Sequence, residues 1–532
     1  MDTTKPSGSP LLRVLRQLVI AGLVLLTPAA LFHVVENFRG KRAWNQYRKD
    51  AEARGLKLNF ADHIPKPIPD SENGANTPFI QSWFPLPRLE GTNQWPDLFG
   101  KANGELATRK DALKGPGAKD ARAFTDLVDW QQAFSYVESS GDEKTPKPDR
   151  PTRAIELDPK EQAAAAAVVL DKLKPYQPAL AELHAMKGRD QVRYPIAYNL
   201  DEPFSILLPH LAKIKGIIQE SSLQASANLA AGQTNQAFET VRLMLWFCDS
   251  LDEEMFLISQ LVRIAGQQIT TQPIWEGLAR HQWSEAQLKE MQERLLRANF
   301  ISALDSSMAV ERAGGMTAIE WVRKQRRREN ALSIFEFVNP QGGSPIPSGL
   351  ATKSLLGWLI PNGWFHFEMA NFGRLMDQAR QDAWDTQTRL LHARTLDHNN
   401  QQLAKQFARG PVDIIWNHYL FARLLLPALE NASKKFALAQ ATAHQAALAC
   451  AMERYYLAQG KYPDALTELV PKFIAKIPNE VVSTNAMRYQ PTAQGYALYS
   501  VGWDGKDDGG EFLLAAKSGE PEKGDWVWRN AP

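Results

Sequence analysis

An uncharged apolar run near the amino terminus, Leu18 to Val35, constrains the fold of this chain more than any other segment. It holds 18 residues, with His33 counted as neutral. As a helix, a run of this size is about 27 Å long, barely enough for a ~30 Å hydrocarbon core. Basic residues stand on both sides of it, namely Arg13, Arg16, Arg39, Lys41 and Arg42. The run therefore suggests a helix in an apolar environment.

Three interpretations of this run are open: an uncleaved membrane anchor, a cleaved signal peptide and a buried core helix. The segment Thr27 to Ala30 lacks a clean small-x-small cleavage pattern, and the apolar run continues beyond it. These features favour an uncleaved anchor, and hence a single-pass inner-membrane protein with most of the chain in the periplasm. The excess of basic residues after the run does not favour export, so the orientation rests on the carboxyl-terminal segment described below.

Length and composition indicate a globular protein with two or three domains. The chain has 532 residues, 44% of them apolar and 23% charged. Its net charge of +2 gives no general attraction to nucleic acid, and we expect none as a partner. The two cysteines, Cys248 and Cys450, lie in apolar helical patterns typical of free buried thiols, although a disulfide between them stays possible. Their number excludes a four-cysteine zinc site.

Five segments follow from local composition. A short basic tail (1–17) precedes the anchor (18–35), and residues 36–153 are predicted to form a membrane-proximal helix and an irregular arm rich in Pro and Trp. Residues 154–427 are predicted to form a multi-helical body, and residues 428–532 a small α+β module. Prolines exclude a helix from Asp62 to Asp70. Three tryptophans are expected to fix the arm to the body: Trp83, Trp95 and Trp130.

Helical periodicity dominates the body. One apolar stripe runs from Leu207 to Leu229, and a second runs from Ala237 to Leu251 after a Gly-containing turn. A third stripe, at Ile258, Leu261, Ala265 and Ile269, is expected to end at Pro273. Ser284 and Gln287 form a capping-box pattern that starts a further helix. The fold class is therefore mainly α, an irregular multi-helical array with an amino-terminal transmembrane helix and the small carboxyl-terminal module.

Charged groups in the body have structural interpretations. We expect Asp252, Glu253 and Glu254 in the first turn of a helix, and Glu311 and Arg312 as a buried ion pair. The basic run from Arg323 to Arg328 precedes a loop and an apolar run that ends at Phe365. These two runs form either a solvated helix face with a core segment, or a surface for anionic lipid or an acidic partner.

The last hundred residues predict a helix packed on a small antiparallel sheet. A helix rich in small residues runs from Ala437 to Ala458, and Asp464 is expected to cap a short helix from Ala465 to Val470. Apolar alternation then predicts three strands, at Met487–Tyr489, Tyr496–Val501 and Trp526–Trp528.

This segment resembles the head of the major pseudopilin of type II secretion systems over residues 428–529. The resemblance rests on Gly460–Pro463, on Leu498–Ser500 and on the Gly/Asp loop from Gly502 to Gly510 that leads to Asp525–Trp526. No Gly-Phe-Thr-Leu-Ile-Glu processing site precedes the apolar run near the amino terminus, so cleavage by a prepilin peptidase is not expected. The whole chain is similar to uncharacterised bacterial membrane-anchored proteins that join a helical body to such a head.

The resemblance implies calcium binding by the Gly/Asp loop. The candidate ligands are Asp504, Asp507 and Asp508, with Asp525 as a further candidate. Carboxylate oxygens on a tight loop suit Ca²⁺. The alternative is a solvent-exposed turn in which Asp and Gly serve backbone geometry.

No phosphate-binding loop, Rossmann glycine pattern, His-Glu-x-x-His or Gly-x-Ser-x-Gly motif is present. We therefore expect an envelope-anchored interaction or scaffold protein, associated with secretion or pilus-like machinery, with the membrane and a protein as its partners. No catalytic residue or organic cofactor is predicted, and an enzyme is the less favoured class. The alternative is an envelope hydrolase with its site between the helical body and the carboxyl-terminal module.

Overall fold

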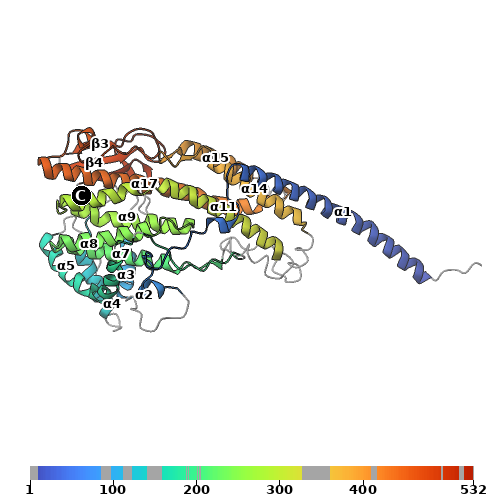
Figure 1. The fold of residues 1–532 in the computed structure, drawn as a ribbon, viewed down its shortest axis with the longest axis horizontal. Coiled ribbons are helices and arrows are strands. Elements are labelled where there is room, and N and C mark those ends of the chain that lie inside the picture. The colour runs from blue at the N-terminus through green and yellow to red at the C-terminus, as the bar shows by residue number, and fades with distance from the viewer. Residues whose placement is uncertain are drawn as a thin grey trace, which may run out of the picture.

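The chain is mainly helical, with small antiparallel sheets near its carboxyl end (Figure 1). This agrees with the prediction of a mainly α fold that ends in a small α+β segment. The computed structural model describes residues 10–84, 97–111, 123–139, 158–186, 188–189, 191–200, 202, 205–325, 360–408, 416–492, 495–514 and 521–530.

Helix α1 (Pro10–Ala53) is the longest element and projects beyond the rest of the molecule (Figure 1). Its 44 residues correspond to about 66 Å of helix. Its carboxyl part crosses α14 (Asn362–Arg380) at two glycines, Gly40 and Gly363. A Cβ atom at Gly363 would overlap the carbonyl oxygen of Glu36, so only glycine permits this approach. The Gly363 N–H donates to Asn37 Oδ1 at 2.8 Å and fixes the crossing point.

The predicted membrane anchor at residues 18–35 needs correction. In the part of the chain that the structure describes, no helix has both the length and the apolar character that crossing a membrane requires. This finding contradicts the predicted single-pass inner-membrane location. The side chains of residues 18–19, 21–23 and 25–26 lie outside the described part.

The segment predicted as an irregular arm contains helices. Prolines keep residues 64–70 out of helix, as expected, but Asp62 and His63, which the prediction also placed outside helix, lie in a 3₁₀ turn. Leu127, Trp130 and Phe134 then form one apolar face that is buried against neighbouring helices, and this burial outweighs the loop-like composition around it. Trp83 and Trp130 are buried as predicted, whereas Trp95 and residues 140–157 lie outside the described residues. The elements of this part are η1 (Phe60–His63), α2 (Pro78–Gln81), α3 (Leu98–Asp111), α4 (Leu127–Ser139), α5 (Pro159–Leu173), η2 (Lys174–Tyr176) and α6 (Gln177–Ala185).

Helices α7 (Pro209–Ala230), α8 (Thr234–Ser250) and α9 (Leu257–Ala279) pack on one another and confirm the predicted helix–turn–helix unit. Gly232 has φ +74° in the turn between α7 and α8, a value that glycine adopts without strain. Leu207 is exposed and precedes α7, so it does not belong to the predicted stripe.

Helix α9 buries a different face from the predicted one and does not end at Pro273. Its buried side chains include Gln260, Arg263 and Gln267, whereas Ile258 is exposed. Gln260 Nε2 donates to the carbonyls of Leu251 (2.6 Å) and Glu254 (2.8 Å), which removes much of the cost of burying its amide. The apolar pattern failed here because the buried face of α9 mixes polar side chains with apolar ones.

Helices α10 (Glu285–Arg297) and α11 (Phe300–Gln325) follow. The predicted capping box is present, with Ser284 and Gln287 each accepting a hydrogen bond from the other's backbone N–H. Arg323 forms an ion pair with Glu320, and residues 326–359, which hold the rest of the basic run and the start of the apolar run, lie outside the described ranges. The remaining elements before the last long helix are β1 (Trp384–Asp385), β2 (Leu390–Leu391) and α15 (Ala393–Phe407).

Helix α17 (Leu420–Gln459) is 40 residues long and passes without a break from the body into the carboxyl-terminal module. The module contains β3 (Arg488–Thr492), β4 (Gly495–Ser500) and β7 (Trp526–Arg529) as an antiparallel sheet in the order β3-β4-β7. Leu498 pairs with both Tyr489 and Trp528 across it. A second pair is formed by β5 (Phe512–Leu514) and β6 (Pro521–Gly524).

The helix-on-sheet arrangement is the predicted one, because α17 packs on β4 and β7. The predicted short helix is instead a 3₁₀ turn, η4 (Leu466–Leu469), with Ala465 rather than Asp464 at its cap. Only four residues separate this cap from Val470, which leaves no room for an α-helix before Pro471. The Asp464 side chain lies 3.5 Å from Lys461 instead.

The α1–α14 crossing gives a direct test of the packing. We expect Gly363→Ala to lower the free energy of unfolding by roughly 1–3 kcal/mol, because the added methyl group must displace the α1 backbone. Gly104→Ala in α3 is the matched control, since nothing lies within 4 Å of its Cβ position. Chemical denaturation of both variants checks this, and equal stabilities would contradict the close crossing.

Candidate functional site

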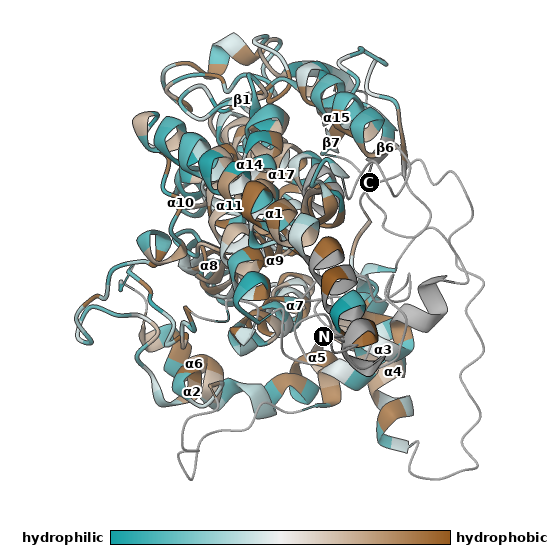
Figure 2. Ribbon diagram, turned by 90° about the vertical axis from the view of Figure 1, so that its right-hand side faces the viewer, coloured by the Kyte–Doolittle hydropathy of each residue, from teal (hydrophilic) through white to brown (hydrophobic). Residues whose placement is uncertain are grey.

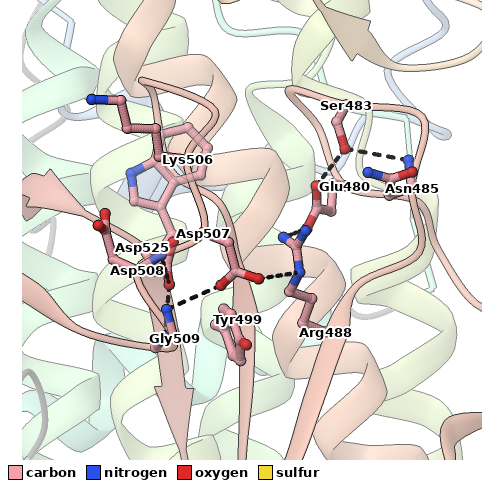
Figure 3. A network of polar contacts seen from close by, with 12 residues as sticks. Glu480, Ser483, Asn485, Arg488, Tyr499, Lys506, Asp507, Asp508, Gly509 and Asp525 are labelled. Carbon is pink, nitrogen blue, oxygen red and sulfur yellow. Dashed lines mark hydrogen bonds and ion pairs between the residues drawn. The ribbon is translucent and has the colours of Figure 1, made fainter.

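The Gly/Asp loop predicted to bind calcium connects β4 to β5 and is held by its own hydrogen bonds (Figure 3). Asp504 Oδ1 accepts the Lys506 N–H at 3.0 Å, and Asp507 Oδ1 accepts the Gly509 N–H at 3.0 Å. Gly502 has φ +64°, and a Cβ atom there would overlap the carbonyl oxygen of Gly524. These bonds are Asx turns of the kind that Asp and Gly favour.

Asp525 holds the loop from beneath. It is fully buried, and its Oδ2 accepts the N–H groups of Asp508 (3.1 Å) and Gly510 (2.7 Å). Burial raises the pKa of Asp525, and the two backbone hydrogen bonds act in the opposite direction. Its Oδ1 has no hydrogen-bond partner among the residues that the structure describes. The role of Asp525 is therefore to accept hydrogen bonds from the backbone of the loop. It does not join the loop carboxylates in a common cluster.

Arg488 on β3 forms an ion pair with the Asp507 carboxylate. Its Nε lies 3.1 Å from Asp507 Oδ2, and its Nη1 lies 3.0 Å from Oε1 of the buried Glu480 (Figure 3). Burial raises the pKa of Glu480, while bonds from Ser483 and Arg488 lower it. The guanidinium thus joins two acids that are far apart in sequence, and Asp507 is neutralised without a metal.

The three predicted ligands are near one another in sequence but do not converge. Figure 3 shows the Asp508 carboxylate on the opposite side of the loop from the Asp507–Arg488 pair. Within the described ranges, no group of three or more His, Cys, Asp or Glu side chains could hold a metal ion. Calcium binding by Asp504, Asp507 and Asp508 stays a prediction, and it requires Asp507 to leave Arg488.

Thermal melting of the full chain with calcium and with a chelator tests that prediction. Calcium binding would raise the melting temperature of the native protein, because only the folded loop assembles the ligands. Asp507→Asn should abolish the rise, whereas Asp464→Asn, on the exposed turn before η4, should leave it unchanged. Identical curves for the native protein with calcium and with chelator would remove the calcium site.

A polar cleft of about 840 Å³ lies between residues 63–68, 191–193, 252–255 and α11. Its charged groups are largely paired. Asp252 lies 2.6 Å from Arg263, and Glu253 lies 3.0 Å from Arg193. The predicted helix-turn position of residues 252–254 is therefore wrong, because they precede α9 and serve these contacts.

Glu254 stands between a buried histidine and a buried serine in the wall of this cleft. Its Oε1 lies 3.1 Å from His210 Nε2, and its Oε2 accepts the Ser259 hydroxyl at 2.7 Å. His210 and Ser259 are both fully buried. A nucleophile needs a base at hydrogen-bond distance, but here the acid contacts both side chains. The arrangement is therefore a buried structural contact, in which neither ring nitrogen of His210 makes a hydrogen bond to the described residues.

The junction between the helical body and the carboxyl-terminal module, where the alternative hydrolase site was predicted, is filled by packed side chains. Trp275 and Leu288 of the body share a core with Leu466, Leu498 and Trp528 of the module. The Trp275 Nε1–H donates to the carbonyl of Arg529 at 2.7 Å and locks the two parts together. The polar cleft and a second cavity, among α11, α14, α15 and α17, are lined by other residues.

A more apolar pocket of about 410 Å³ lies among α11, α14, α15 and α17, and we call it the arginine-lined pocket. Met308, Met376 and Leu403 contribute to its apolar wall, and Arg312, Arg380 and Arg423 contribute its charge. The volume falls within the ~300–1,000 Å³ common for small-molecule sites. Sequence analysis missed this pocket, because each arginine comes from a different helix and carries no local motif.

The predicted Glu311–Arg312 pair is not formed. Neighbouring helical residues point in directions about 100° apart, so the two side chains diverge. Arg312 Nη2 lies 3.0 Å from Asp377 Oδ1, and burial raises the pKa of Glu311. Asp377 also accepts from Arg54 at 2.7 Å. One carboxylate is thus shared by two guanidinium groups.

Glu220 on α7 is a fully buried acid whose two carboxylate oxygens have no hydrogen-bond partner in the described structure. Burial raises its pKa to about 8. The carboxyl is therefore neutral in the folded protein at neutral pH, whereas the same group ionises in the unfolded chain.

This buried carboxyl predicts a pH dependence of stability. A pKa raised in the folded state adds stability at low pH, and that stability is lost as the pH rises from about 4.5 through about 8. The loss is at most about 5 kcal/mol. Denaturation of the native protein and of Glu220→Gln between these pH values should show a steeper decline for the native protein. Parallel profiles would contradict a neutral Glu220.

No model of a known protein family matches this chain, and neither a curated protein nor a solved structure matches it. The arguments for its function therefore come from its own geometry.

Proposed function

We propose that this protein is an interaction or scaffold protein whose helical body holds α1 out as an arm that binds an apolar helix of a protein partner. The observation that carries this proposal is the exposure of large apolar side chains on α1. Val24, Leu31 and Phe38 are 65%, 62% and 68% exposed. Contiguous exposed apolar surface of this kind is typical of interaction sites.

The spacing of these side chains favours a helical partner. Val24, Leu31 and Phe38 recur every seven residues, and Ile20 and Val34, both exposed, lie on the same side of the helix. Figure 2, which looks toward the end from which α1 projects, shows hydrophobic residues along this helix. A seven-residue apolar repeat is the pattern by which one helix packs along another.

The attachment of α1 to the body suits a scaffold. The Gly40–Gly363 crossing brings the two helix backbones together, and the Tyr47 ring fills the space above Gly373 of α14. Arg54 at the end of α1 forms a 2.7 Å ion pair with Asp377 of the same helix. These contacts fix the direction of the arm, which lowers the entropic cost of binding.

The carboxyl-terminal module supports the same role. The sequence resemblance of residues 428–529 to a pseudopilin head suggests that the module also contacts other proteins. The resemblance also supports an association with secretion or pilus-like machinery. Among the described strands, β3 lies at the edge of its sheet and pairs with β4 alone, so its other edge could take such a contact.

Site-specific photo-crosslinking in the cells that produce the protein tests this proposal. A photoreactive side chain at Leu31 should give one defined protein adduct, whereas the same group at Gln46, on the polar part of α1, should not. Mapping the adduct should place the contact on an apolar helix of the partner, and Val24→Glu should reduce its yield at least about tenfold.

Three outcomes would overturn the proposal. They are equal adducts from both positions, adducts to lipid alone, and flotation of the purified chain with vesicles in place of a protein complex. An adduct to a second copy of this chain would identify the partner helix as α1 itself and would support the proposal. Circular dichroism of Val24→Glu separates loss of the partner from loss of folding.

A further inference from the structure

The arginine-lined pocket has an apolar wall and positively charged side chains, so it suits a ligand that is both apolar and anionic. Its walls come from α11, α14, α15 and α17, which lie side by side in Figure 1. Met308, Met376, Leu403 and Leu426 line it with flexible or branched apolar side chains, and Phe407 adds an aromatic ring. Methionine and leucine side chains adapt readily to an aliphatic chain. The body of the ligand should therefore be apolar.

Arg312 supplies a buried donor that the protein leaves unused. Its side chain is 4% exposed, and its Nε has no hydrogen-bond partner among the residues that the structure describes. An unsatisfied buried N–H is costly, and the cost is greater when the group is charged. An acceptor on a bound ligand would remove that cost.

The charge balance around Arg312 favours an anion. Asp377 is shared by Arg312 and Arg54, so one of the two guanidinium charges is not balanced by it. Burial raises the pKa of Tyr47, which donates to Asp377 at 3.3 Å and stays neutral. Among the described residues of this cluster (Arg54, Arg312, Tyr47 and Asp377), one net positive charge therefore remains.

Two further guanidinium groups line the same pocket. Arg423 on α17 is exposed and has no carboxylate within ion-pair distance in the described part of the chain. Arg380 is paired with Asp305 at 2.5 Å and stacks over Trp384, so it contributes less free charge. Arg312 and Arg423 thus both contribute guanidinium groups to the lining of this pocket.

We propose that the arginine-lined pocket binds a small amphipathic carboxylate, an aliphatic monoacid of the fatty-acid class. The carboxylate would accept from Arg312 and Arg423, and the chain would lie against the methionine and leucine side chains. A planar carboxylate matches the forked donors of arginine, and a charge-assisted bond of this kind is stronger than a neutral one. This proposal is independent of the α1 partner.

Calorimetric titration of the full chain with decanoate, decanol and acetate tests the ligand class. Decanoate should bind, whereas decanol and acetate should each bind at least about tenfold more weakly, because each lacks one of the two parts recognised. Equal affinity for decanoate and decanol would overturn the role of the arginines. Failure of decanoate to bind would overturn the proposal as a whole.

Variants locate the site. Arg423→Gln should weaken decanoate binding by roughly tenfold without unfolding the protein, since the side chain is exposed. Ala404→Trp, at another exposed position that lines the pocket, should block the cavity and reduce binding as much or more. Arg48→Gln on α1 is the matched control, because that side chain is exposed and its only described ion pair is long, at 3.9 Å. Unchanged binding in both pocket variants would place the ligand elsewhere and overturn the proposal.

Discussion

The close approach of neighbouring elements to α17 is the constraint on which the rest of the structure depends. Along its middle, Ala437, Ala439, Ala441 and Ala443 are all fully buried, and further buried alanines follow. Small side chains let α9, α10, α11, α14 and the module's sheet approach the same helix. A larger residue at most of these positions would separate two elements that share a core.

Buried amides on α17 complete this packing where neighbouring elements begin or end. Gln440 accepts the N–H of Phe300 at 2.8 Å and donates to the carbonyl of Ala298 at 3.1 Å, which joins the end of α10 to the start of α11. Gln445 donates to the carbonyl of Trp526 at 2.6 Å, at the start of β7. Backbone groups at helix ends lack hydrogen-bond partners within their own helix. The amide side chains of α17 supply such partners to the neighbouring elements. Glu220 and Arg312 are among several buried residues with polar atoms that lack a hydrogen-bond partner in the described structure.

Local patterns in the sequence predicted local structure well. The capping box at Ser284, the glycine turn at Gly232 and the strands of the module follow from rules that act over a few residues. The free, buried state of Cys248 and Cys450 was also foreseen. The buried face of α9 was not, because it includes polar side chains such as Gln260, and folding brings Gln260 to the backbone carbonyls that bond it. The arginine-lined pocket was missed for the same reason: its residues come from 308 to 433 and meet only after folding.

The crossing of α1 and α14 has a mechanical consequence. The amino-terminal part of α1 extends away from the point where the α1 and α14 backbones touch at Gly40 and Gly363 without intervening side chains. A load on this part would therefore act about that contact. A force applied near Val24 would act as a torque on α14, and α14 contacts both α11 and α17. Since α17 runs unbroken into the carboxyl-terminal sheet, tension at one end of the molecule would reach the other through continuous helix rather than through loops.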